Sequence, residues 1–318
     1  MSLDSFPKEL LLMTTEYLPL RDLEALALTF NKSITLACLP ELEPLFARRR
    51  HEARMTALFG ACSAPVNSRS GLKDYLEDLG IPADAELKNI KSGQVDLSYL
   101  DLKGDLHWLG PLDRGTERAM APHMETHSST GLPLLQKQAE KASITLPSAL
   151  VKVLESKELM DRIPDRGASH FQLIGSLRKC PAKLHGGLGG FAVCFYTDQQ
   201  DWPYWLLYLI PSPPGQVSPH CVLRSTTTGI PYESEDVDSE YDKALWTKEE
   251  RDGAMKEEWD MSVLCTDDVR LDGYDFEEWL AQHYFDEWLG FVLYEKVKWD
   301  DPNIERLREY VREVYVKR

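Results

Sequence analysis

Phe-Ala-Val-Cys-Phe at residues 191–195 and Tyr-Trp-Leu-Leu-Tyr-Leu-Ile at residues 204–210 are the stretches that decide the fold. Aromatic and β-branched residues dominate both stretches, so each predicts a β-strand. Residues 198–201 are polar and lie between the two strands, which predicts a hairpin loop and an antiparallel pair. His-Cys-Val-Leu at residues 220–223 predicts a third strand of the same sheet.

Helical patterns lie on both sides of these strands. Leu146-Pro147 opens a predicted helix that extends to Leu159, residues 274–294 predict an aromatic, strongly apolar helix, and a charged helical tail begins at Asn303. Towards the N-terminus, residues 6–45 predict three short helices, of which the third is closed by Pro40, and residues 45–60 predict a further helix.

The predicted fold class is therefore α+β, with N-terminal helices and a helical spacer followed by an α+β domain with a mainly antiparallel sheet. The expected divisions are residues 1–45, a helical spacer and polar loop at residues 46–135, and an α+β recognition domain at residues 136–318. Residues 231–260 hold twelve acids and four bases, and they predict a mobile acidic insertion in that last domain.

Composition narrows the class of protein. The chain has 318 residues, of which 43% are hydrophobic, so it can build a substantial core. Its formal net charge of −16 disfavours nucleic acid and anionic membrane surfaces as partners. The six cysteines show no pair at metal-ligand spacing, and the first residues show no signal-peptide pattern. We therefore expect a cytoplasmic or nuclear protein with reduced cysteines.

The N-terminal segment has a distinctive pattern. It reads Phe-Pro-Lys-Glu-Leu-Leu-Leu at residues 6–12 and Tyr-Leu-Pro-Leu-Arg-Asp-Leu at residues 17–23. This pattern resembles the opening of the F-box family. The resemblance implies that the first helix and its turn lay an apolar edge into a groove on the Skp adaptor, which assembles with a cullin. The residues that would supply or support this edge are Phe6, Pro7, Leu10, Leu11, Leu18, Pro19 and Leu23.

Short pieces of the C-terminal half share a second pattern. They include Leu146-Pro147-Ser148, Arg162-Ile163-Pro164, Gly189-Gly190-Phe191, Asp198-Gln199-Gln200, His220–Leu223 and Phe276–Leu280. Together they are similar to the fungal SUKH superfamily, the group of the cell-wall-synthesis regulators. The resemblance implies an α+β module that mediates protein–protein interactions.

Three features invite a chemical interpretation, and each has a simpler one. The glycine run at residues 186–190 precedes a predicted strand and no Lys-Ser/Thr follows, which favours a flexible turn over a phosphate loop. His220 and Cys221 are neighbours on a strand and point to opposite faces, so Cys221 is predicted to be a buried structural residue. The acids of residues 231–260 lack the spacing of a calcium loop. We therefore predict no catalytic residue, no metal site and no cofactor.

The predicted hairpin loop and its exit combine polar, charged and aromatic side chains, as a recognition surface does. The predicted target-binding residues are Asp198, Gln199, Asp201, Trp202 and Tyr204.

The sequence thus predicts a substrate-recognition adaptor of a Skp–cullin–F-box ubiquitin ligase, which would hold a protein target close to the ligase. The alternative is a SUKH-type interaction or regulatory protein whose F-box is vestigial or serves a non-ligase role. The third is an enzyme whose site is not visible in the sequence.

Overall fold

The structure of the 318-residue chain is a computed structural model. It describes residues 32–63, 72–88, 90, 95–111, 131–165, 169–180, 189–198, 203–213, 215–225, 269–295 and 304–317. The chain divides into two compact units, Met1–Ala57 and Leu58–Arg318. The boundaries expected near residues 45 and 135 therefore differ from the division between the units, which lies after Ala57.

The described part of the smaller unit belongs to one helix, α3 (Lys32–Phe59), which ends just inside the larger unit. The prediction that a helix ends at Pro40 is wrong, because α3 continues through both Pro40 and Pro44. A proline inside a helix removes one hydrogen bond and crowds the preceding turn, but the turns on either side can still hold the helix together.

The larger unit contains a five-stranded antiparallel sheet whose strands follow chain order. The strands are β1 (Ser169–Lys179), β2 (Phe191–Asp198), β3 (Tyr204–Leu209), β4 (His220–Ser225) and β5 (Val269–Gly273). The α+β class is confirmed, and so is the hairpin, since β2 and β3 pair with Thr197 opposite Tyr204. β4 and β5 are neighbours although residues 226–268 separate them in the chain.

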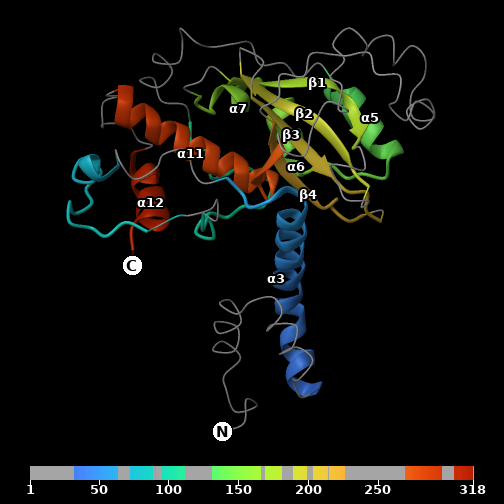
Figure 1. Cartoon of the computed structure of the whole chain (residues 1–318), viewed down its shortest axis with the longest axis horizontal. Coiled ribbons are helices and arrows are strands. Elements are labelled where there is room, and N and C mark those ends of the chain that lie inside the picture. Colours follow the sequence, from blue (N-terminus) through green and yellow to red (C-terminus); the bar gives the residue numbers. More distant parts are fainter. Residues whose placement is uncertain are drawn as a thin grey trace. The chain divides into compact units, whose positions relative to one another are not determined.

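Several helices of the larger unit accompany the sheet. They are the short 3-10 helix η2 (Leu72–Tyr75) and the α-helices α5 (Leu132–Lys141), α6 (Ser148–Glu155), α7 (Lys157–Asp161), α11 (Phe276–Glu295) and α12 (Ile304–Tyr315). In Figure 1, α11 and α12 lie to the left of the sheet and α5 lies to its right, beside β1, and buried side chains of α5 and α11 belong to one core cluster. The helix predicted from Leu146 to Leu159 is two helices, because the Ser156 hydroxyl accepts a hydrogen bond from the Leu159 N–H (3.2 Å) and caps the start of α7.

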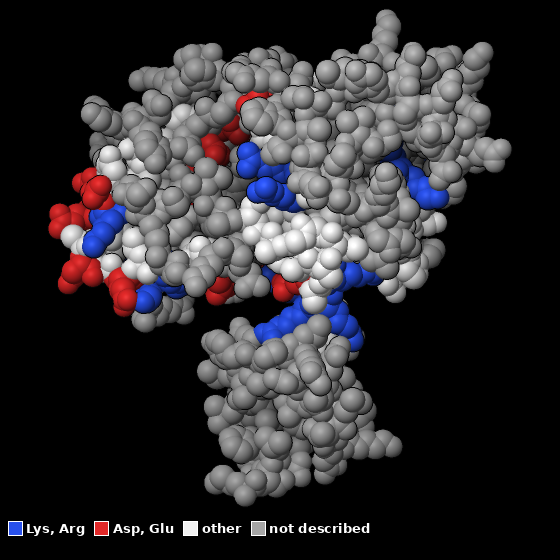
Figure 2. All heavy atoms as spheres, viewed as in Figure 1, with Lys and Arg blue, Asp and Glu red and all other residues white. Residues whose placement is uncertain are grey.

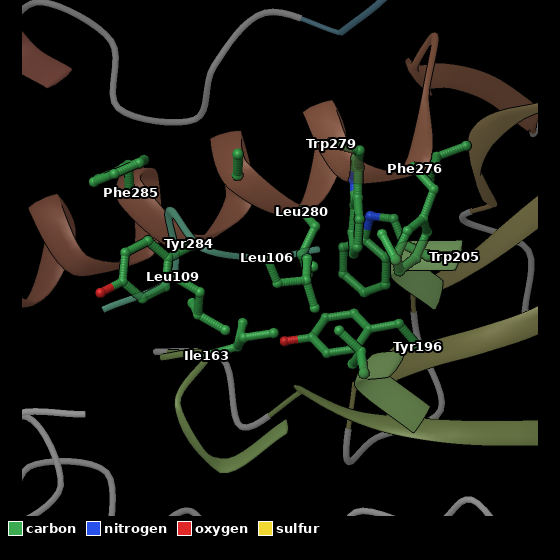
Figure 3. Packing of buried hydrophobic residues seen from close by; sticks show 14 of the residues in the cluster. Leu106, Leu109, Ile163, Tyr196, Trp205, Phe276, Trp279, Leu280, Tyr284 and Phe285 are labelled. Atoms are coloured by element: carbon green, nitrogen blue, oxygen red, sulfur yellow. The ribbon is translucent and has the colours of Figure 1, made fainter. Parts of the chain in front are cut away.

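One sheet face packs against α11 through a cluster of aromatic side chains. The ring of Trp279 on α11 lies 5.1 Å from that of Phe195 at 88°, and the Nε1–H groups of Trp279 and Trp205 both donate to Asp272 Oδ2 at 2.9 Å. Figure 3 shows Trp279 above Trp205, with Leu106 beside them. Side chains between residues 72 and 109, among them Leu106, belong to this same core, so that segment folds as part of the larger unit.

Candidate functional site

An open groove lies where the end of α5 meets α6 and the segment after β3. Its volume is about 510 Å³, within the roughly 300–1,000 Å³ of small-ligand pockets. Four lining residues are apolar, and the others are polar or charged. The lining consists of Gln136, Ala139, Glu140, Ser143, Ile144, Thr145, Leu146, Val151 and Ser212.

The end of α5 forms the first wall of the groove. The Ser143 N–H donates to the Glu140 carbonyl (3.1 Å) and the Ile144 N–H to the Ala139 carbonyl (2.8 Å), a Schellman motif. This motif needs a left-handed residue, and Ser143 supplies it with φ of 55°. Glycine is the usual residue at this position because it has no Cβ to clash. The turn also brings Ile144 back against Ala139, which builds the apolar floor.

The segment after β3 forms the opposite wall. The Ser212 N–H donates to the Ser143 carbonyl (3.1 Å), and Thr145 exchanges bonds with Ser218: its N–H donates to Ser218 Oγ (2.9 Å) and its carbonyl accepts from the Ser218 N–H (3.4 Å). Val217, the neighbour of Ser218, is 64% exposed, which is unusual for a β-branched aliphatic side chain. These hydrogen bonds hold the segment after β3 against the end of α5, and Val217 itself lies outside the groove lining.

The chemistry of the lining suits binding. Ala139, Ile144, Leu146 and Val151 offer apolar contact, while hydroxyls and one amide offer hydrogen bonds. Glu140 is the charged residue of the described lining; its side chain is exposed and makes no ion pair within the described part of the chain. An apolar floor with a few polar groups is the usual composition of a recognition pocket.

A second cluster, formed by Asp165, Tyr196 and His283, resembles an acid–base group. The Tyr196 hydroxyl donates to Asp165 Oδ2 (2.6 Å) and lies 3.0 Å from His283 Nε2, which is 3.4 Å from the same carboxylate oxygen. Burial disfavours the charged forms, but the Asp165–His283 contact prevails: it lowers the pKa of Asp165 and raises that of His283. Burial, reinforced by Asp165, raises the pKa of Tyr196.

This cluster holds the fold together. Tyr196 is fully buried, and the His283 ring stacks on Trp279 with 5.1 Å between centroids and 7° between planes. The three side chains come from the residues before β1, from β2 and from α11, so the cluster connects three elements. A largely buried, internally hydrogen-bonded group of this kind stabilises a specific packing.

The start of α11 is fixed by a second histidine–carboxylate pair, in which His220 is buried and Asp275 is partly exposed. Asp275 Oδ1 accepts from the N–H groups of Glu277 (2.8 Å) and Glu278 (3.2 Å), and its Oδ2 lies 3.0 Å from His220 Nε2. Burial opposes both charges, yet the mutual contact lowers the pKa of Asp275 and raises that of His220. Cys221 is fully buried, as predicted, and burial raises its pKa.

The predicted site residues are only partly covered by the structure. The F-box-like residues Phe6, Pro7, Leu10, Leu11, Leu18, Pro19 and Leu23 lie outside the described residues, as do Gln199, Asp201, Trp202 and the acidic stretch 231–260. Asp198 ends β2 and is partly exposed. Tyr204 begins β3 with an exposed fraction of 7%, and neither residue lines the groove. Gly189 and Gly190 have positive φ and lead directly into β2, as a turn into a strand should.

The chain matches no protein family, no curated protein and no solved structure. None of the helices within the described residues is long and apolar enough to span a bilayer. Within the same residues, no three histidine, cysteine or acidic side chains come together as metal ligands would.

Proposed function

We propose that this chain is a non-catalytic adaptor, in which the N-terminal segment holds a Skp–cullin assembly and the larger unit holds a protein target. The observation that carries the second half of the proposal is the open groove between α5 and α6, with its apolar floor and polar rim. The first half rests on the F-box-like pattern of residues 6–23.

The contrast between the groove and the titratable clusters favours binding over catalysis. Of the described side chains that most resemble acid–base machinery, Asp165 and Tyr196 are buried and His283 is largely buried, and the three bond to one another. The groove is open, and its polar groups are hydroxyls, an amide and a single carboxylate. A general base must reach its substrate within hydrogen-bond distance, and the buried Asp165 is already bonded to Tyr196.

The mechanism would be proximity. An adaptor that binds the ligase with one segment and the target with another converts the encounter between them into an intramolecular event, and it raises their effective concentration without forming a covalent bond itself. The alternative is a SUKH-type interaction protein that uses the same groove without a ligase. The two functions differ in one property, which is binding to Skp.

The test uses the full chain with Pro7→Ala and Leu10→Ala combined. We expect the double variant to lose co-purification with a Skp adaptor, because apolar anchors at the centre of an interface carry most of its binding energy. Leu12→Ala, in the same stretch but outside the predicted edge, is the matched control and should retain Skp. Equal Skp recovery by the wild-type protein and the double variant would exclude the ligase role and leave the alternative.

A further inference from the structure

We infer that the groove between α5 and α6 takes a segment of a partner protein in which a lysine or arginine lies beside an aliphatic residue. This inference rests on the proposed binding function and gives the groove a ligand class. The cationic side chain would lie against Glu140, and the aliphatic one on the floor formed by Ile144, Leu146 and Val151.

Two groove residues occupy positions that local structure disfavours. Glu140 lies in the last turn of α5, where the partial negative charge of the helix end repels an acid. Ser143 adopts a left-handed conformation, φ of 55°, that glycine would adopt without strain. Both side chains line the groove. Neighbouring residues that local helix and backbone preferences disfavour are expected where function requires their side chains.

The charge of the groove and of the whole chain indicates the charge of the ligand. Glu140 supplies a carboxylate at the groove, and it makes no ion pair within the described residues. The whole chain carries a formal net charge of −16, so a cationic segment approaches with less electrostatic cost than an anionic one. On the face shown in Figure 2, acidic side chains also gather at the left edge of the larger unit, where Figure 1 draws residues 72–88 and away from α5. Lys137 and Lys141 of α5 lie outside the lining, so the charge that faces the groove, Glu140, and the net charge of the chain favour the same kind of partner.

The apolar floor of the groove indicates that the ligand carries an aliphatic side chain beside its cationic one. Ile144 is buried and Val151 and Leu146 are partly buried, so the floor leaves some aliphatic surface for contact. A side chain of the size of valine or leucine gains most from such contact, because the gain follows the apolar area removed from water. The rim hydroxyls of Ser143 and Thr145 can bond to the backbone of the segment.

The experiment selects binders from a phage-displayed random octapeptide library with the full-length protein. The wild-type protein should enrich peptides with lysine or arginine within two residues of valine, isoleucine or leucine. Glu140→Lys should enrich acids at the position where the wild type enriched bases. A fluorescent peptide with the wild-type consensus should bind Glu140→Lys about tenfold more weakly in an anisotropy titration. The variant should fold well, since lysine suits the end of a helix.

Glu155→Lys is the matched control. Glu155 is exposed on α6 outside the groove lining, so this substitution makes the same change in net charge and should leave the selected consensus unaltered. The inference is overturned by a wild-type selection without a basic–aliphatic consensus, or by an equal shift in both variants. Because Skp binding depends on the N-terminal segment, its result does not alter this one, and the two proposals can fail separately.

Discussion

Asp286 provides the sharpest test of the packing between α11 and α12. Its Oδ1 accepts hydrogen bonds from the hydroxyls of Tyr310 and Tyr315, each at 2.8 Å, and its side chain is buried. Burial raises its pKa from the ordinary 3.8 to about 6, since the two hydroxyls and the nearby His283 only partly replace hydration and Glu287 adds repulsion. The perturbation is Asp286→Asn, which keeps an accepting oxygen and removes the charge.

The expected pH dependence follows from linkage. The unfolded chain releases the proton near pH 3.8 and the folded chain near pH 6, so between these values the folded state binds more protons. The free energy of unfolding of the wild type therefore falls as the pH rises through this window, by about 3 kcal/mol in total. The free energy of unfolding of Asp286→Asn does not fall in this way, because asparagine has no carboxyl group to titrate. Its new amide N–H group is a buried donor that costs about 1–3 kcal/mol, but this cost is the same at every pH.

The assay is urea unfolding, followed by tryptophan fluorescence, at pH 4, 5, 6 and 7. The free energy of unfolding of Asp286→Asn minus that of the wild type should rise by about 2 kcal/mol from pH 4 to pH 7, because part of the total change lies below pH 4. Asp84→Asn, which neutralises an exposed carboxylate, should give a constant difference. Parallel curves for Asp286→Asn and the wild type would refute the assignment of a strained buried carboxylate.

Two further substitutions test features of the larger unit. Ser143→Gly should raise the free energy of unfolding by about 1 kcal/mol, because glycine relieves the left-handed strain at the end of α5; a lower melting temperature would contradict the Schellman geometry. Arg270→Glu should stabilise by about 0.5–1 kcal/mol, because Arg224 lies directly opposite across β4 and β5 and the change turns a repulsive pair into an attractive one. Arg270→Gln is its control, and 1 M salt should remove the advantage of glutamate over glutamine.

Several elements were predictable because their signals are local. The β2–β3 hairpin follows from two apolar runs around a polar loop, and α11 and α12 coincide closely with the helices predicted near residues 274–294 and from Asn303. β1 was not predicted, since Gln172, Ser176 and Arg178 interrupt its apolar residues. β5 was not predicted either, because it is short and follows a long acidic stretch.

The candidate groove could not be predicted, for a physical reason. It joins Gln136 on α5 to Ser212 after β3, and its shape depends on the backbone conformation of Ser143. Serine gives no signal for a left-handed turn, whereas glycine would have given one. The contact between Asp165 and His283 could not be predicted either, because a contact between residues so far apart in the chain leaves no periodic pattern in the sequence.

The pairing of β4 with β5 has a consequence for how this protein can vary. The entropy lost in closing a flexible connection grows with the logarithm of its length, so doubling the chain between Ser225 and Val269 would cost only about 0.6 kcal/mol. The register of the two strands rests on their own buried side chains, such as Leu223 opposite Leu271, and needs no tight turn. A change in the length of the chain between β4 and β5 is therefore inexpensive for the sheet.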